Sequence, residues 1–149
     1  GFVARFFTAP LLVLWGREVD NGEVRRKIVE YQLHKNVILG GFNDQMDIFW
    51  KFCDIYLFLS LNDGFGLPIV EGYMHGVPCV TFEDLDATQD LYYPEAMLKV
   101  KDRSIESVAN ALRTSLDKNW NHEEIAEIGN MFSIDSMSEK YVNWYRTLI

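Results

Sequence analysis

The sequence of 149 residues has little positive charge, few cysteines and no long apolar run. Its net charge of −8 argues against a protein that binds nucleic acid or anionic membranes, because an acidic surface repels both. The longest apolar runs, 9–15 and 55–61, are far shorter than the roughly 18 residues that cross a bilayer, so we expect a soluble domain. The two cysteines, Cys53 and Cys79, have apolar neighbours and predict buried thiols in a reducing, cytoplasmic protein rather than a disulfide or a metal site.

Material for a core is plentiful, since 48% of the residues are hydrophobic and 14% are aromatic. A chain of this length and composition predicts one ordered domain of ordinary size. The first residue is Gly1, inside the amphipathic stretch GFVARFF, and no basic segment leads into an apolar one as in a signal peptide. Such a start is typical of a domain with a cut edge.

Short apolar runs alternate with helix-like segments through the first half of the chain. The strand-like runs are 10–15, 36–41, 54–60 and 77–82, and the helix-like segments are 22–34, 44–52 and 68–75. This alternation predicts successive βα units, and strands that are apolar throughout indicate that helices cover both faces of the sheet. We therefore predict an α/β fold, a Rossmann-like parallel sheet with helices on both faces.

The second half of the chain has a different pattern. A polar loop at 83–94 and a short apolar piece at 97–100 precede three segments with helical spacing, at 105–116, 123–130 and 135–147. Asp102 or Ser104 is the expected N-cap of the first of these helices. The last helix carries a stripe that we expect to pack on the domain, formed by Met137, Tyr141, Trp144 and Tyr145.

The segment 60–72 (SLNDGFGLPIVEG) carries the clearest sign of a binding site. A predicted strand ends at Ser60, a glycine-rich loop follows, and Pro68 stands where the first helical turn begins. At the carboxyl edge of a parallel sheet, the N–H groups of such a loop and of the first helical turn can bind an anion. The expected ligand is a phosphate or a diphosphate.

Two acids flank this predicted anion site. Asp63 and Glu71 are eight positions apart, a spacing that lets both face one crevice. Ionised carboxylates accept hydrogen bonds from neighbouring hydroxyls, so the combination describes a sugar nucleotide. The residues alone also fit a tight βα turn in which the glycines serve geometry and the acids are solvated.

The segments 63–68 (DGFGLP) and 76–80 (GVPCV), with Glu71 between them, resemble the E-G-F-G-L-P-x-x-E…G-x-P-V-V signature of retaining GT-B-fold glycosyltransferases, family 4-like or group 1. Further strands of the same donor-binding, C-terminal domain resemble residues 11–16, 36–42 and 56–60. The resemblance implies one half of a GT-B fold, in a cytoplasmic or peripheral inner-membrane hexosyltransferase of polysaccharide biosynthesis. It also implies a UDP- or GDP-sugar donor, a saccharide or lipid-linked glycan acceptor, and neither cofactor nor metal.

The resemblance assigns roles to individual positions. Glu71 would bind the ribose hydroxyls, and Asp63, at the first acid of the family's E-x7-E pair, would be a catalytic residue that meets hydroxyls of the donor sugar. Aspartate is one methylene shorter than the family's glutamate, which affects donor positioning or sugar identity. The loop that meets the diphosphate and donor sugar comprises Gly64, Phe65, Gly66 and Leu67. The loop beside the base comprises Gly41, Phe42 and Asn43.

Several parts of such an enzyme would precede Gly1 by the same resemblance. These parts are the acceptor domain, the first strand of the donor-binding domain, and the Arg and Lys that neutralise the diphosphate. In the family the Lys lies just before a helix, and GFVARFF is expected to be the last part of that helix. Arg17 is a possible phosphate contact, and Arg5 is expected at a solvated helix position. We therefore expect the isolated 149 residues to bind weakly and to catalyse nothing, with any membrane association made by the full-length enzyme.

Three alternatives compete with this interpretation. A metal-dependent glycosyltransferase of the other common architecture would use an Asp-x-Asp pair, which Asp84 and Asp86 match as a string. A signalling receiver domain needs acids at the end of its first strand, and the segment 14–16 has none. A sugar-nucleotide-binding or regulatory domain of the same fold with a degenerate site is the third, suggested by Asp63 and by the missing cations.

Overall fold

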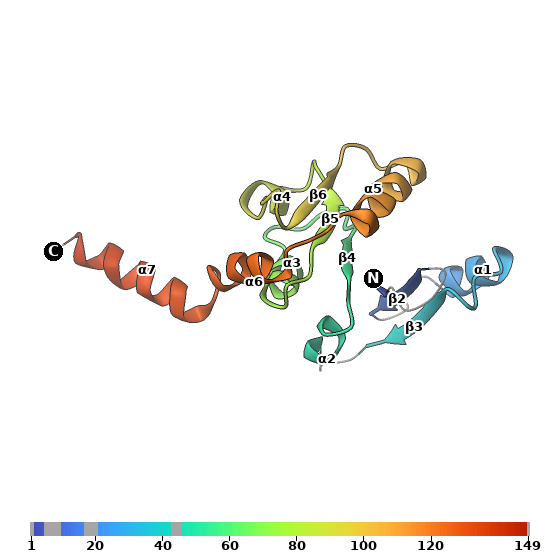
Figure 1. The fold of residues 1–149 in the computed structure, drawn as a ribbon, viewed down its shortest axis with the longest axis horizontal. Helices are drawn as coiled ribbons and strands as arrows, with labels where there is room; N and C mark the ends of the chain where they lie inside the picture. Colours follow the sequence, from blue (N-terminus) through green and yellow to red (C-terminus); the bar gives the residue numbers. More distant parts are fainter. Residues whose placement is uncertain (1, 5–9, 17–20, 43–45, 149) are drawn as a thin grey trace. The chain divides into compact units, whose positions relative to one another are not determined.

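A computed structural model describes residues 2–4, 10–16, 21–42 and 46–148 of the chain (Figure 1). The chain divides into two compact units, Gly1–Leu57 and Phe58–Ile149. The strands are β1 (Phe2–Ala4), β2 (Leu11–Trp15), β3 (Val37–Gly41), β4 (Ile55–Phe58), β5 (Cys79–Phe82) and β6 (Met97–Val100). The helices are α1 (Glu23–Glu30), α2 (Met46–Trp50), α3 (Leu67–Met74), α4 (Asp86–Asp90), α5 (Ile105–Asp117), α6 (His122–Asn130) and α7 (Ile134–Arg146). The predicted alternation of strands and helices is confirmed from β2 to β6.

Within the first unit, β1 lies between β2 and β4, and β2 pairs with β3 in parallel. Strand β1 runs antiparallel to both of its neighbours, with Phe2 opposite Val13 on one side and Tyr56 on the other. The expectation that GFVARFF ends a helix is therefore wrong for residues 2–4. Aromatic and β-branched residues favour strands, and a strand between two others satisfies its backbone groups on both sides. Arg5 lies outside the described residues.

Two segments differ most from the sequence-based boundaries, and elsewhere the ends shift by at most about two residues, as at β4, which ends at Phe58 rather than at Ser60. Helix α1 ends at Glu30 rather than at residue 34, because Gln32 adopts a positive φ of 55° that an α-helix cannot contain. Residues 83–94, expected as a polar loop, contain the short helix α4. The segment contributes to the core, because its apolar residues Leu85, Ala87 and Leu91 are buried. The many polar residues around them led to the prediction of a loop.

The core of the second unit is built around β5. This strand pairs in parallel with β6, from Cys79 opposite Met97 to Phe82 opposite Val100, and all four of its residues are buried. A strand buried at every position is what a parallel sheet covered on both faces requires. Cys53 and Cys79 are both buried as thiols, as predicted.

Helix α3 is fixed against α6 by a close backbone approach. Gly129 of α6 lies so near the backbone of Tyr73 and Met74 that a Cβ atom at this position would collide with it. On the buried side of α3, the Tyr73 hydroxyl donates a hydrogen bond to the Leu91 carbonyl at 3.1 Å. Burial raises the pKa of Tyr73 well above its ordinary value, so this hydroxyl stays protonated and keeps its hydrogen bond.

Helix α7 follows α6 at the C-terminal end of the chain (Figure 1). None of its residues is buried. Its expected apolar stripe is exposed to between 40% and 58% at Met137, Tyr141, Trp144 and Tyr145. The expectation that this stripe packs on the domain is therefore wrong. Helical periodicity identifies the apolar face of a helix but not the element that covers it.

Candidate functional site

The loop between β4 and α3 is held in shape by bonds within itself. The Ser60 hydroxyl donates to the Asn62 carbonyl at 2.9 Å, and the Gly66 N–H donates to Asp63 Oδ1 at 2.6 Å. Gly66 then forms the N-cap of α3 in the left-handed conformation, with φ 81° and ψ 44°. The loop therefore enters the helix through a closed turn between Asp63 and Gly66.

Gly66 is required by space as well as by conformation. A Cβ atom at this position would lie 2.9 Å from the Cβ of Ala87 and 3.1 Å from the Cδ1 of Ile69. Pro68 occupies the first turn of α3, as predicted from its fixed φ. The ring of Phe65 meets the ring of Phe132 edge-on, with centroids 6.3 Å apart. Neighbouring structure thus fixes both the end and the middle of the loop.

Three backbone N–H groups at this turn are available to an anion. Among the described residues, the amides of Gly64, Phe65 and Leu67 have no hydrogen-bond acceptor, whereas the Gly66 amide is bonded to Asp63. They lie at the N-terminus of α3, where the helix dipole and unpaired amides favour negative charge. Of the amides that the sequence assigns to the diphosphate, the structure leaves all but that of Gly66 unoccupied.

Glu71 lies on the exposed side of α3. It follows Leu67 by four residues, so the two share one face of the helix, separated by roughly 6 Å along its axis. Both are exposed, while Ile69, Val70 and Tyr73 of the same helix are buried. Within the described part of the chain, the Glu71 carboxylate has no hydrogen bond or ion pair. It is available to accept hydrogen bonds from a ligand on this face.

Asp63 has a structural role that the sequence does not reveal. One of its carboxylate oxygens closes the turn by accepting the Gly66 N–H three residues later. A short aspartate side chain suits this local bond, as in other turns where Asp hydrogen-bonds to nearby backbone. The side chain is half-buried, and only its second oxygen remains for a ligand.

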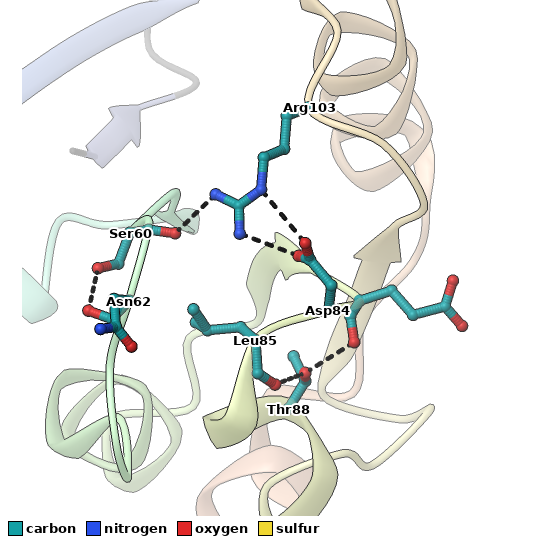
Figure 2. Close-up of polar contacts among 7 residues, drawn as sticks. Ser60, Asn62, Asp84, Leu85, Thr88 and Arg103 are labelled. Carbon is teal, nitrogen blue, oxygen red and sulfur yellow. Dashed lines mark hydrogen bonds and ion pairs between the residues drawn. The ribbon is translucent and has the colours of Figure 1, made fainter.

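Asp84, the first acid of the Asp-x-Asp string, is engaged by an arginine (Figure 2). Arg103 donates from Nη2 to Asp84 Oδ1 at 3.0 Å and from Nε to Asp84 Oδ2 at 3.3 Å. Its Nη1 donates to the Ser60 carbonyl at 3.4 Å. A carboxylate whose two oxygens both bind a guanidinium is poorly placed to hold a divalent cation. Across the described ranges, no three His, Cys, Asp or Glu side chains form a potential metal site.

Arg103 is the residue near this loop that sequence reasoning missed. It follows β6 as Asp84 follows β5, and parallel strands end at one edge of a sheet, which was the available signal.

The residues assigned to the base belong to the first unit, whereas the loop 63–67 and Glu71 belong to the second. In the first unit, Gly41 ends β3 with φ 69°, and Phe42 is exposed. Asn43 and Arg17 lie outside the described residues.

Comparison with known proteins adds to this geometry. A model of the family described as "Glycosyl transferases group 1" matches residues 7–130. The O-antigen biosynthesis glycosyltransferase WclY of Escherichia coli is 23% identical over 145 residues, which cover 91% of this chain and 38% of WclY.

Two solved structures share the fold. Sucrose-phosphate synthase from Thermosynechococcus elongatus superposes with a TM-score of 0.79 at 20% identity, over 95% of this chain and 39% of that one. HepE from Anabaena, solved in complex with UDP, gives a TM-score of 0.74 at 17% identity, over 92% of this chain and 41% of HepE. The chain thus has the α/β, Rossmann-like fold found in GT-B glycosyltransferases, and it spans about two fifths of the length of these relatives.

Proposed function

This chain belongs to the group 1 glycosyl transferases, and we propose that it is the donor-binding part of an enzyme that transfers a sugar from a nucleotide donor. The transfer retains the configuration at the anomeric carbon, and the acceptor is a saccharide or a lipid-linked glycan. One observation carries the proposal. Among the described residues, backbone amides at the start of α3 have no hydrogen-bond acceptor, and the Glu71 carboxylate one helical turn later has no hydrogen bond or ion pair.

The diphosphate of the donor binds at the N-terminus of α3. The amides of Gly64, Phe65 and Leu67 donate to its oxygens, and the helix dipole adds to their attraction. Negative charge grows on the diphosphate as the glycosidic bond breaks, so preorganised donors at this position stabilise the transition state more than the ground state. In an acidic domain these local amides supply attraction that the overall charge does not.

The Glu71 carboxylate accepts hydrogen bonds from the ribose hydroxyls of the same donor. Its position on the same helix face as Leu67 allows one nucleotide to reach both the amides and the carboxylate. The second oxygen of Asp63 contacts a hydroxyl of the donor sugar, while the first keeps the turn closed. The UDP in the HepE structure supports a uridine nucleotide as the first donor class to examine.

The proposal covers location and completeness as well. We place the protein in the cytoplasm, where reducing conditions keep the two buried cysteines as thiols. Among the helices that the structure describes, none combines the length and the apolar character of a bilayer-crossing segment. The acceptor is held by parts of the enzyme outside this chain, so the 149 residues alone transfer no sugar.

Calorimetric titration of the natural-length protein with UDP-glucose and GDP-mannose tests this function. In the protein with Glu71→Gln, we expect the dissociation constant for the bound donor to rise at least about tenfold, because a charge-assisted hydrogen bond contributes about 1.5–3 kcal/mol. The matched control is Glu106→Gln in the first turn of α5, which should leave binding unchanged. An unaltered dissociation constant in Glu71→Gln would contradict the assignment of this residue. Failure of the unmodified protein to bind any sugar nucleotide would favour a degenerate domain of the same fold.

A further inference from the structure

We propose that Arg103 is a positioning residue that holds the donor loop, defined as residues 60–66, in the conformation that binds the nucleotide sugar. The inference rests on the proposed function of this loop, and it assigns a role to a side chain outside the glycine-rich motif. In this role Arg103 acts on donor binding indirectly, through its hydrogen bond to the Ser60 carbonyl and the turn that follows.

The guanidinium joins three segments of the second unit. Nε and Nη2 bind the two oxygens of Asp84, and Nη1 binds the Ser60 carbonyl (Figure 2). The guanidinium carbon also lies 4.5 Å from the centroid of the Phe82 ring, a cation–π distance. Arg103 follows β6, Phe82 and Asp84 belong to the end of β5 and the residues after it, and Ser60 follows β4. One planar group therefore ties the donor loop to the neighbouring strand ends.

The backbone that carries Arg103 is itself fixed. Asp102 Oδ1 accepts the Ser104 N–H at 2.8 Å, and Asp102 Oδ2 accepts the Ser107 hydroxyl at 2.7 Å. Ser104 caps α5 by accepting the Ser107 N–H at 3.1 Å. Arg103 lies between Asp102 and Ser104, so its backbone is already ordered by their hydrogen bonds. The contacts of its side chain therefore cost little additional backbone entropy.

The contact at Ser60 extends to the ligand-binding end of the loop. Arg103 fixes the orientation of the Ser60 carbonyl, and the Ser60 hydroxyl binds the Asn62 carbonyl. The next residue is Asp63, whose carboxylate closes the turn on Gly66. Without the hydrogen bond from Arg103, the Ser60 carbonyl and the loop that follows it are free to move. A displacement of about 1 Å at a catalytic site can cost roughly 100-fold in rate.

Lysine should not replace Arg103. The three contacts to Asp84 and Ser60 use three different nitrogens of one rigid plane. A lysine ammonium presents a single charge with no such plane, and it cannot span a carboxylate and a carbonyl in the same geometry. A role that needed only positive charge would survive Arg103→Lys, whereas a positioning role would not.

The test compares Arg103→Ala and Arg103→Lys with Arg113→Ala in the natural-length protein. Arg113 is a matched control because it is an exposed arginine of the same unit whose guanidinium bonds to Asn110 on its own helix, at 2.9 Å. The first readout is the hydrogen exchange of the Gly66 amide, which reports on the closed turn without any ligand. We expect at least about tenfold faster exchange in both Arg103 variants and no change in Arg113→Ala.

The second readout is UDP binding by calorimetry, alongside the unfolding temperature. We expect the dissociation constant for UDP to rise about tenfold in both Arg103 variants, while the unfolding temperature stays within about 2 °C, because a partly exposed ion pair contributes little to stability. Unchanged exchange at Gly66 overturns the positioning role, whether or not the protein binds UDP. Absence of UDP and sugar-nucleotide binding by the unmodified protein overturns the proposed function, and the exchange result still decides the role of Arg103.

A general loss of structure has its own signature. If Arg103→Ala raises exchange throughout the second unit and lowers the unfolding temperature strongly, the arginine supports the fold and not the donor loop. Asp84→Asn provides a milder variant, since it keeps the shape of the side chain and weakens its bond to the guanidinium. In Asp84→Asn we expect the Gly66 amide to exchange faster than in the unmodified protein, but by a smaller factor than in the Arg103 variants. An unchanged exchange rate of the Gly66 amide in Asp84→Asn would also overturn the proposal.

Discussion

Replacing Gly66 by alanine should damage the fold and the donor loop together, for two separable reasons. The backbone at Gly66 is left-handed, with φ 81°, and an alanine in this conformation costs about 1–2 kcal/mol. The added Cβ would also lie 2.9 Å from the Cβ of Ala87, which is completely buried. Overpacking of this kind costs about 1–3 kcal/mol, because one of the two helices must shift.

These two costs give an expected loss of about 3 kcal/mol in the free energy of unfolding. A domain of this size is stabilised by about 5–15 kcal/mol in total, so the variant should still fold. Its unfolding temperature should fall by roughly 6–12 °C, since 1 kcal/mol corresponds to about 2–4 °C at this length. The shift of α3 should also disturb the Asp63–Gly66 bond and weaken donor binding.

Gly64 provides the matched control within the same loop. Its φ lies outside the left-handed region, and an added Cβ would meet nothing within 4 Å. Gly64→Ala should therefore change the unfolding temperature by less than about 2 °C. Urea or thermal unfolding of the two variants measures the difference. Equal stability of Gly66→Ala and Gly64→Ala would refute the argument from conformation and space.

Three further predictions concern acidic residues of the second unit. Asp63→Asn retains the acceptor for the Gly66 N–H and should keep the stability of the protein, whereas Asp63→Ala should lose about 1 kcal/mol in urea unfolding. Both substitutions should slow sugar transfer, and full turnover by Asp63→Asn would leave Asp63 with a structural role alone. Donor binding should be the same with and without a chelator, because Asp84 is bonded to Arg103, and a loss of binding in the chelator would restore the metal-dependent alternative. Hydrogen bonds from Ser104 and Ser107 lower the pKa of Asp102 below its ordinary 3.8, so its stabilising effect is present above this pH and is lost as the pH falls through the lowered value. The stability difference between the unmodified protein and Asp102→Asn should therefore disappear in acid, and a difference independent of pH would contradict this assignment.

Local patterns in the sequence predicted the parts of this structure that depend on neighbouring residues. The glycine-rich loop, Pro68 in the first turn of α3 and Ser104 as the cap of α5 all follow from short-range chemistry. The α/β alternation follows from runs of apolar residues and from helical spacing. The exposed position of Glu71 follows from the same spacing, because its apolar neighbours occupy the other face of the helix.

The features that the sequence did not predict depend on distant partners. Phe2–Ala4 became an antiparallel strand because β2 and β4 were both available to pair with it. Arg103 is 43 residues from Ser60, and nothing in the intervening sequence marks their contact. The stripe on α7 has the pattern of a packed helix, yet the described part of the chain does not cover it. The unexpected bond from Gly66 to Asp63 arises because a carboxylate that could bind a ligand can also bind its own backbone.

The close contact at Gly129 has a consequence for the entropy of donor binding. Helices α3 and α6 meet backbone to backbone there, so the helix that begins at the donor loop has little freedom to tilt or slide on a fast timescale. We expect backbone order parameters near 0.85 along α3, both with and without nucleotide. The protein then loses little conformational freedom when a donor arrives, and the loss falls mainly on the flexible ligand.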